Sequence, residues 1–228
     1  MNLLALDTST VACSVALSAA GVVYERHEER AREHTRLLLP MITGVLADAR
    51  LDIADVDAVI LGNGPGSFIG LRIAAAVAQG LCHASGARLV PLSSLAAVAQ
   101  AAMAGAAATR VLVAQDAHMH EVYLAAFEAG PDGSPCAAGA VRLCPAGPIA
   151  DLYAGSLAAG AGWHRYPALW QANRARLAGR LDILYPRAAS LLAAGAAALE
   201  RGRYVDPERL EPAYVREHVA QPAPVAGA

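Results

Sequence analysis

The sequence 62-GNGPGSFIGLR-72 joins two runs of different character. The run before it, 57-DAVILG-62, has the composition of a buried strand, and the run after it, 73-IAAAVAQGL-81, has that of a helix. Four glycines at this junction allow a tight turn, and they also allow backbone N–H groups to approach a phosphate. Two interpretations are therefore open: a plain strand-to-helix turn, and a phosphate-binding loop.

The same alternation of strands and helices runs through the chain. Residues 1–106 predict three strands, then helix, strand, helix, strand and helix. Residues 107–217 begin alike, because an apolar strand ends in Asp116 as the first strand ends in Asp7. We expect an α/β protein with two lobes, each a mixed β-sheet covered by helices. Residues 218–228 have little apolar bulk and are predicted to form a disordered tail.

Two aspartates at equivalent strand ends favour the actin-like ATPase (ASKHA) fold. In that fold, carboxylates and glycine turns of two lobes approach a nucleotide in a cleft, where backbone N–H groups bind phosphate. The nucleotide-loop candidates lie at the strand ends and in the glycine turn: Asp7, Thr8, Ser9, Gly64, Gly66, Ser67 and Asp116. An independent ATPase or kinase-like enzyme built on these residues is the alternative function.

Composition excludes several classes. The chain has no lysine, so it has neither a P-loop lysine nor a Schiff-base lysine. A net charge of −2 gives no footprint for nucleic acid, and we expect contact with tRNA only through partners. The start has no basic leader and no apolar run is long enough for a membrane span, so we expect a cytoplasmic protein without a membrane. The four cysteines have no CxxC spacing, which argues against a disulfide framework.

One segment, 116-DAHMHE-121, could hold a metal ion. On a strand, Asp116, His118 and His120 would share one face, and zinc accepts such ligands. The segment straddles a predicted turn between strands, however, and no further ligands are obvious. We expect exposed turn histidines and no metal site.

The helix expected after Glu33 has apolar side chains on more than one face. A fully buried core helix and a helix–helix interface both fit this pattern. The next helix, after Gly70, is rich in alanine, which permits close approach of a neighbour. Arg72 could contact an anion of a partner, or pair with Asp7 or Asp116. The predicted partner-interface residues are Leu38, Leu39, Met41, Ile42, Val45, Leu46, Arg72 and Ala76.

Six segments, in order, resemble the TsaB (YeaZ) family: LLALDTST, REHTRLLLPMI, GNGPGSFIGLRIA, QDAHMHEVY, AGAGW and LEPAYVRE. The resemblance covers residues 1 to about 217, and GPGSF-x-GLR is its most specific element. It implies an actin-like fold and a relationship to TsaD, which transfers a threonylcarbamoyl group to the adenosine beside the anticodon of tRNA. It further implies binding to TsaD, to TsaE through the complex, and to a second copy when the protein is alone.

The resemblance also implies that this chain is a non-catalytic paralogue. TsaD-like proteins bind a metal through an HxxxH helix, and Ser94 and Val98 stand at those positions here. No cofactor is then required, although ATP or ADP could bind at the interface of the complex. Two departures from the family, Ile69 for threonine and His118 for arginine, weaken the transfer of ligand-binding roles. A metallopeptidase is the third alternative, but the chain lacks HExxH.

Overall fold

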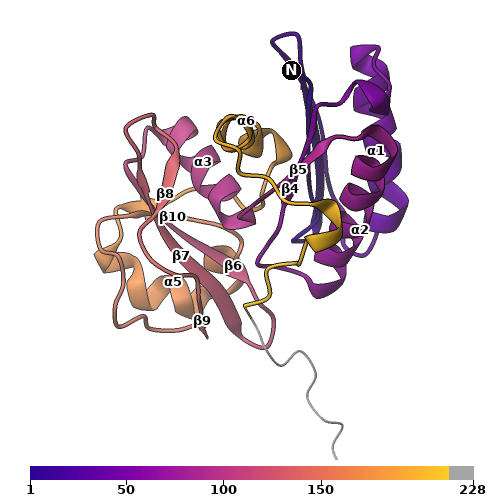
Figure 1. Ribbon diagram of the computed structural model, residues 1–228. Helices are drawn as coiled ribbons and strands as arrows, with labels where there is room; N and C mark the ends of the chain where they lie inside the picture. The colour runs from indigo at the N-terminus through magenta and orange to yellow at the C-terminus, as the bar shows by residue number, and fades with distance from the viewer. Residues whose placement is uncertain (216–228) are drawn as a thin grey trace, which may run out of the picture.

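The computed structural model describes residues 1–215 as two β-sheets with helices on their faces (Figure 1). The first sheet has the strand order β3-β2-β1-β4-β5, and the second has the order β11-β10-β6-β7-β8, with β9 beside β7. The first contains β1 (Leu3–Asp7), β2 (Ala12–Ala19), β3 (Val22–Glu29), β4 (Ala58–Gly62) and β5 (Arg88–Leu92). The second contains β6 (Arg110–Asp116), β7 (Glu121–Ala129), β8 (Pro135–Ala137), β9 (Arg142–Pro145), β10 (Leu157–Ala159) and β11 (Gly179–Arg180).

Helices follow in the predicted order over residues 1–106. The α-helices are α1 (His34–Ala49), α2 (Phe68–Ser85), α3 (Ser94–Ala106), α4 (Gly162–Arg165), α5 (Pro167–Asn173) and α6 (Leu192–Glu200). Short 3-10 turns complete the fold: η1 (Ile53–Asp55), η2 (Arg174–Arg176), η3 (Ala188–Leu191) and η4 (Pro207–Arg209). Serine caps explain two of the starts, because Ser67 and Ser93 each accept a hydrogen bond from the first turn of the helix that follows.

The two sheets share one arrangement around a central strand. In the first, β1 pairs antiparallel with β2 and parallel with β4. In the second, β6 pairs antiparallel with β7 and parallel with β10. Asp7 and Asp116 therefore end equivalent central strands, as the sequence predicted, and the mixed sheets of the α/β class are confirmed.

Helices cover both faces of the first sheet. On one face, α1 and α2 pack over Leu4, Leu6 and Val15, while α6 and η3 cover Leu3 and Ile60 on the other. Residues 188–200 belong to the predicted second lobe, residues 107–217, but they pack on the first sheet. Their alanine- and leucine-rich face covers strands β1 and β4. The predicted boundary between residues 106 and 107 stays a prediction.

Helix α3 belongs to the cores of both lobes. Leu95 and Val98 pack beneath the second sheet, and Ala97 packs with the residues on the first. Figure 1 shows α3 and α6 between the two sheets, with α1 and α2 on the outer side of the first. The carboxyl ends of β1 and β6 are held on either side of this shared layer.

Within residues 1–215, α2 alone is long and apolar enough to cross a membrane by length and composition. Its apolar residues also have a place in the fold, because Leu71, Ala74, Ala78 and Cys82 are buried on its sheet-facing side. The predicted disordered tail, residues 218–228, lies outside the described residues.

We predict that Gly195→Ala destabilises the protein. A methyl group at Gly195, in α6, would collide with the fully buried side chain of Ile60 in β4. Overpacking of this kind lowers the free energy of unfolding by about 1–3 kcal/mol. Gly80→Ala in α2 is the control, since its methyl group meets nothing within 4 Å and alanine favours a helix by about 1 kcal/mol. Urea denaturation checks both, and equal or greater stability of Gly195→Ala would contradict this packing.

Candidate functional site

The end of β1 lies buried beneath the glycine loop. The Oδ1 atom of Asp7 accepts hydrogen bonds from Ser9 N at 2.8 Å and from Ser9 Oγ at 2.7 Å. Thr8 Oγ1 donates to the Gly70 carbonyl oxygen at 2.7 Å, and Ser67 N donates to the Ser9 carbonyl oxygen at 2.6 Å. The hydroxyls and amides of this strand end therefore bind the loop itself.

Glycine is needed in the loop because two backbone segments touch there. A β-carbon at Gly66 would collide with the Ser9 carbonyl oxygen, and one at Gly70 would collide with that of Thr8. On the other side of the loop, Gly64 N donates to Ser94 Oγ at 3.0 Å. Close backbone contact within the fold thus accounts for the glycines, as the plain-turn interpretation requires.

Burial changes the acid–base behaviour of Asp7. Loss of contact with water raises the pKa of its carboxyl above the ordinary value of 3.8. The nearby hydroxyl of Ser94, the hydrogen bonds from Ser9 and the nearby His34 oppose this rise in pKa. The Oδ2 atom of Asp7 has no hydrogen-bond partner among the described residues. His34 is itself buried at the start of α1, with no hydrogen-bond partner for Nε2 among the described residues.

Asp116, at the end of β6, is occupied by neighbours of its own lobe. Its Oδ1 accepts hydrogen bonds from Tyr166 Oη at 2.6 Å and from His118 N at 2.9 Å. Its Oδ2 lies 2.9 Å from Arg165 Nε in an ion pair. The carboxylate is therefore neutralised and fixed, and it holds the β6–β7 turn against α4.

The predicted turn after Asp116 is confirmed. His118, Met119 and His120 have positive φ values of 59°, 54° and 58°, so the strand alternation stops at Asp116. His120 turns to the ring of Tyr166, with centroids 6.0 Å apart. Over residues 1–215, no three His, Cys, Asp or Glu side chains are grouped to hold a metal ion.

A cleft of about 1070 Å³ lies between the two strand ends. Ser9, Ser67 and Asp116 line it, so the structure brings together these three nucleotide-loop candidates from the two lobes. Asp7 and Thr8 lie buried below its surface. His34, His164 and Arg165 also line the cleft, and the sequence analysis did not select them. His34 is remote in sequence from the adjacent pair His164 and Arg165, and no local motif connects the two segments.

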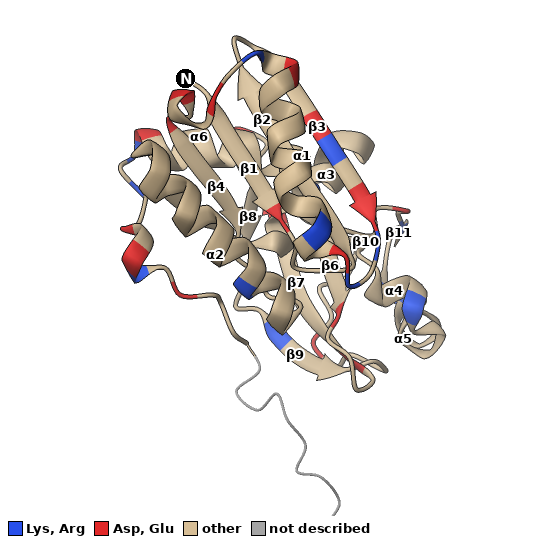
Figure 2. Cartoon of the chain, turned by 90° about the vertical axis from the view of Figure 1, so that its right-hand side faces the viewer, with Lys and Arg blue, Asp and Glu red and all other residues tan. Residues whose placement is uncertain are grey.

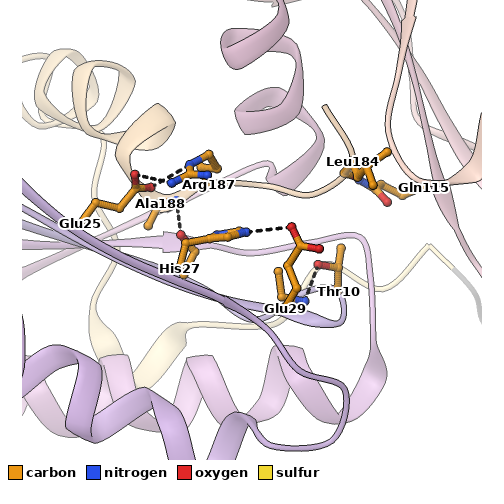
Figure 3. Close-up of polar contacts among 10 residues, drawn as sticks. Thr10, Glu25, His27, Glu29, Gln115, Leu184, Arg187 and Ala188 are labelled. Atoms are coloured by element: carbon orange, nitrogen blue, oxygen red, sulfur yellow. Dashed lines mark hydrogen bonds and ion pairs between the residues drawn. The ribbon is translucent and has the colours of Figure 1, made fainter. Parts of the chain in front are cut away.

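Residues 184–188 run between the two lobes, and Leu184 lines this cleft. Gln115 Nε2 donates to the Leu184 carbonyl oxygen at 2.6 Å, on the side of the second lobe. Arg187 Nη2 lies 2.8 Å from Glu25 Oε2, and Ala188 N donates to Ser14 Oγ at 2.8 Å, on the side of the first (Figure 3). Residues 184–188 thus tie both sheets to one another.

Burial corrects five of the eight residues predicted to form the partner interface. Leu39, Arg72 and Ala76 are exposed, and Leu39 keeps 51% of its surface. The other five residues are buried in the core between α1 and the first sheet, and we correct them to core residues: Leu38, Met41, Ile42, Val45 and Leu46. Figure 2 shows few charged residues along α1 and α2.

Arg72 pairs with neither Asp7 nor Asp116, which corrects that alternative. Its guanidinium carbon lies 3.3 Å from the ring centroid of Phe68 and 5.4 Å from that of Tyr214. The spacing of Phe68 and Arg72, four residues apart on a helix, was a usable signal. Tyr214, in the segment LEPAYVRE, is remote in sequence, and its ring packs against that of Phe68 with centroids 5.5 Å apart. Arg216, of the same motif, lies outside the described residues.

Comparison with known proteins agrees with this geometry. A family model described as "TsaD: tRNA N6-adenosine threonylcarbamoyltransferase" matches residues 16–142. The "tRNA threonylcarbamoyladenosine biosynthesis protein TsaB" of Escherichia coli K12 is 34% identical over 224 residues, which is 96% of either chain. The chain belongs to the TsaB family. The protein of the same name from Haemophilus influenzae is 48% identical over 123 residues, covering 54% of this chain and 52% of that one.

A solved TsaB-family structure supports the fold. "YeaZ from Pseudomonas aeruginosa" superposes with a TM-score of 0.84 at 36% identity, covering 94% of this chain and 99% of that one. The predicted actin-like, two-lobed fold is therefore confirmed. Ile69, in the first turn of α2, is the most exposed of the large apolar side chains in residues 1–215, at 70%.

The start of α3 contains Ser94 and Val98, which the resemblance aligns with an HxxxH pair. Ser94 is fully buried and its Oγ accepts the hydrogen bond from Gly64 N. Val98, one helical turn later, is fully buried among the apolar residues beneath the second sheet. Both residues that stand at the expected HxxxH positions are thus used within the fold.

The raised pKa of Asp7 predicts a pH dependence of stability. The folded protein holds the Asp7 proton to higher pH than the unfolded chain does, so ionisation of Asp7 costs folding free energy. The free energy of unfolding of the wild type, relative to Asp7→Asn, should fall as pH rises from 3.8 through the raised pKa. Urea denaturation of both proteins over this range measures it, and a constant difference would show that burial does not raise the pKa.

Proposed function

We propose that this TsaB-family protein is the non-catalytic partner subunit for transfer of a threonylcarbamoyl group to the adenosine beside the anticodon of tRNAs. Its relatives are named for threonylcarbamoyladenosine biosynthesis. The observation that carries the non-catalytic part is the burial of Ser94 and Val98 at the positions of the metal-binding histidines. A serine bound to Gly64 N and a core valine offer a metal no ligand.

The proposed partners are TsaD directly and TsaE through the complex. The exposed face of α1 and α2, with Leu39, Arg72 and Ala76, is the surface on which TsaD docks. Exposed apolar residues on a face with few charges are typical of such a surface. The free protein forms a homodimer through the same face, and TsaD takes the place of the second copy.

This chain requires no cofactor of its own in the proposal. The hydroxyl of Thr8 and the amide of Ser67, which would serve a nucleotide, are bound to Gly70 and Ser9. ATP or ADP binds instead at the interface of the complex. A net charge of −2 supports contact with tRNA only through the partners. The proposed location is the cytoplasm.

The alternative, an independent ATPase or kinase-like enzyme, needs carboxylates within reach of a nucleotide and its metal ion. Asp7 is buried, and Asp116 is bound by Arg165 and Tyr166. Metal-dependent ATP turnover by the isolated protein, abolished in Asp7→Asn, would favour this alternative.

We predict that modification of tRNA requires this chain and TsaD together. The assay is formation of threonylcarbamoyladenosine in tRNA by a reconstituted reaction that contains this chain, TsaD, TsaE and a threonylcarbamoyl donor. Omission of either this chain or TsaD should abolish the product. Product formed without TsaD would refute the non-catalytic assignment, and full activity without this chain would refute its role.

We further predict that Leu39→Asp weakens binding to TsaD at least tenfold, which is about 1.4 kcal/mol. The substitution places a charge on the proposed docking face, and Leu39 is exposed, so the fold is kept. Val23→Asp, at an exposed apolar residue of the edge strand β3, is the matched control and should bind as the wild type does. Isothermal titration calorimetry measures the affinity of both variants for TsaD. Equal affinities would show that the interface lies elsewhere.

A further inference from the structure

Four exposed apolar side chains line one groove, and Arg72 lies over the rings of two of them. Phe68 and Ile69 start α2, Met119 lies in the β6–β7 turn, and Tyr214 lies in the C-terminal segment. Their exposed fractions are 37%, 70%, 51% and 44%. We call these five residues the bridging patch, because they come from both lobes and from the segment that runs between them (Figure 1).

The groove beside the patch has a volume of about 320 Å³. Phe68, Ile69, Met119 and Tyr214 line it together with the buried side chain of Tyr123. Asp116, which is paired with Arg165, and His118 also line it. Aromatic, methionine and arginine side chains are those that protein–protein interfaces concentrate at their centres. The groove can therefore receive an apolar side chain, and Arg72 contacts the rings of two residues that line it, Phe68 and Tyr214.

Arg72 is held in place by the two rings. Its guanidinium stacks on Phe68 and lies near Tyr214, and it forms no ion pair within residues 1–215. Stacking uses the faces of the guanidinium and leaves its in-plane N–H donors for a carboxylate, which they bind in bidentate geometry. A stacked arginine also loses less conformational freedom on binding than a free one.

Hydrogen bonds to backbone carbonyl oxygens hold the segment before Tyr214 against the glycine loop and α2. Asn63 Nδ2 donates to the Glu211 carbonyl oxygen at 3.0 Å, and Ala213 N donates to the Asn63 carbonyl oxygen at 3.3 Å. Further back, Gln79 Nε2 donates to the Pro207 carbonyl oxygen at 2.7 Å. The patch is therefore assembled before any partner arrives.

We propose that the bridging patch binds an acidic–apolar segment of a protein partner, with an Asp or Glu carboxylate on Arg72 and a neighbouring apolar side chain in the groove. The patch has one cation among four apolar residues, whereas a nucleic-acid site gathers several cations. Arg165, across the turn, is bound to Asp116. The partner is the TsaD-family protein, so this inference rests on the proposed function; Arg72 connects the patch to the α1–α2 face.

The test is isothermal titration of the full chain with TsaD. Arg72→Gln should raise Kd about 10- to 100-fold and reduce its dependence on salt, since a buried charge-assisted pair is lost. The Kd of Arg72→Lys should lie between those of the wild type and Arg72→Gln, because lysine keeps the charge but lacks the planar guanidinium. Arg88→Gln is the matched control: Arg88 also lies over a ring, that of Tyr204 at 4.7 Å, on strand β5 away from the patch. It should bind as the wild type does.

Two further measurements identify the ligand of Arg72. Glu217 is a nearby carboxylate in sequence and lies outside the described residues, so Glu217→Gln tests whether the chain supplies its own acid. It should leave Kd unchanged. Titration of a fluorescent tRNA with the wild type and with Arg72→Gln should give equal affinities. Thermal unfolding of each variant checks that the fold is kept.

Each other outcome overturns the proposal. If Arg72→Gln binds TsaD with wild-type affinity while Leu39→Asp loses binding, the bridging patch is not the binding site, and the proposed function still holds. A change in Kd for Glu217→Gln equal to that for Arg72→Gln would assign the arginine to the chain's own carboxylate. Weaker tRNA binding by Arg72→Gln with unchanged TsaD binding would assign it to nucleic acid. Absence of any TsaD binding by the wild type would overturn the patch and the proposed partner together.

Discussion

Closure of the glycine loop onto the end of β1 is the contact on which the rest of the first lobe depends. Ser67 N binds the Ser9 carbonyl oxygen, and Thr8 Oγ1 binds that of Gly70, so the start of α2 is fixed to the central strand. The position of α2 in turn sets the exposed face that it shares with α1, and it places Phe68 and Arg72 beside the second lobe. In this chain, a loop shape suited to phosphate has a structural use within the protein.

In the second lobe, an ion pair helps to fix the end of the central strand. Asp116 ends its central strand and is held by Arg165, Tyr166 and the amide of His118. Asp7, its counterpart, is held by Ser9 and covered by the loop. Both strand ends thus hold their aspartate through contacts within the chain: Asp116 through both carboxylate oxygens, and Asp7 through Oδ1, while Asp7 Oδ2 has no hydrogen-bond partner among the described residues.

Local signals predicted the fold well and the surface poorly. Strand and helix order, the turn after Asp116 and the duplicated central strands follow from composition and periodicity, which depend on near neighbours. The width of an apolar stripe, by contrast, does not separate core from surface. Met41, Ile42 and Leu46 looked available for a partner because α1 is apolar on several sides, but the curved first sheet and α2 cover them. The contact of Arg72 with Tyr214 spans most of the chain, and no sequence spacing indicates it.

Helix α3 has a consequence for how the molecule loses its structure. Leu95 and Val98 complete one hydrophobic core, and Ala97 completes another. Neither sheet can be stripped of its apolar cover without also uncovering the other, because the same helix shields both. Melting should therefore be a single cooperative event, with calorimetric and van't Hoff enthalpies that agree, even though the chain is built from two sheets.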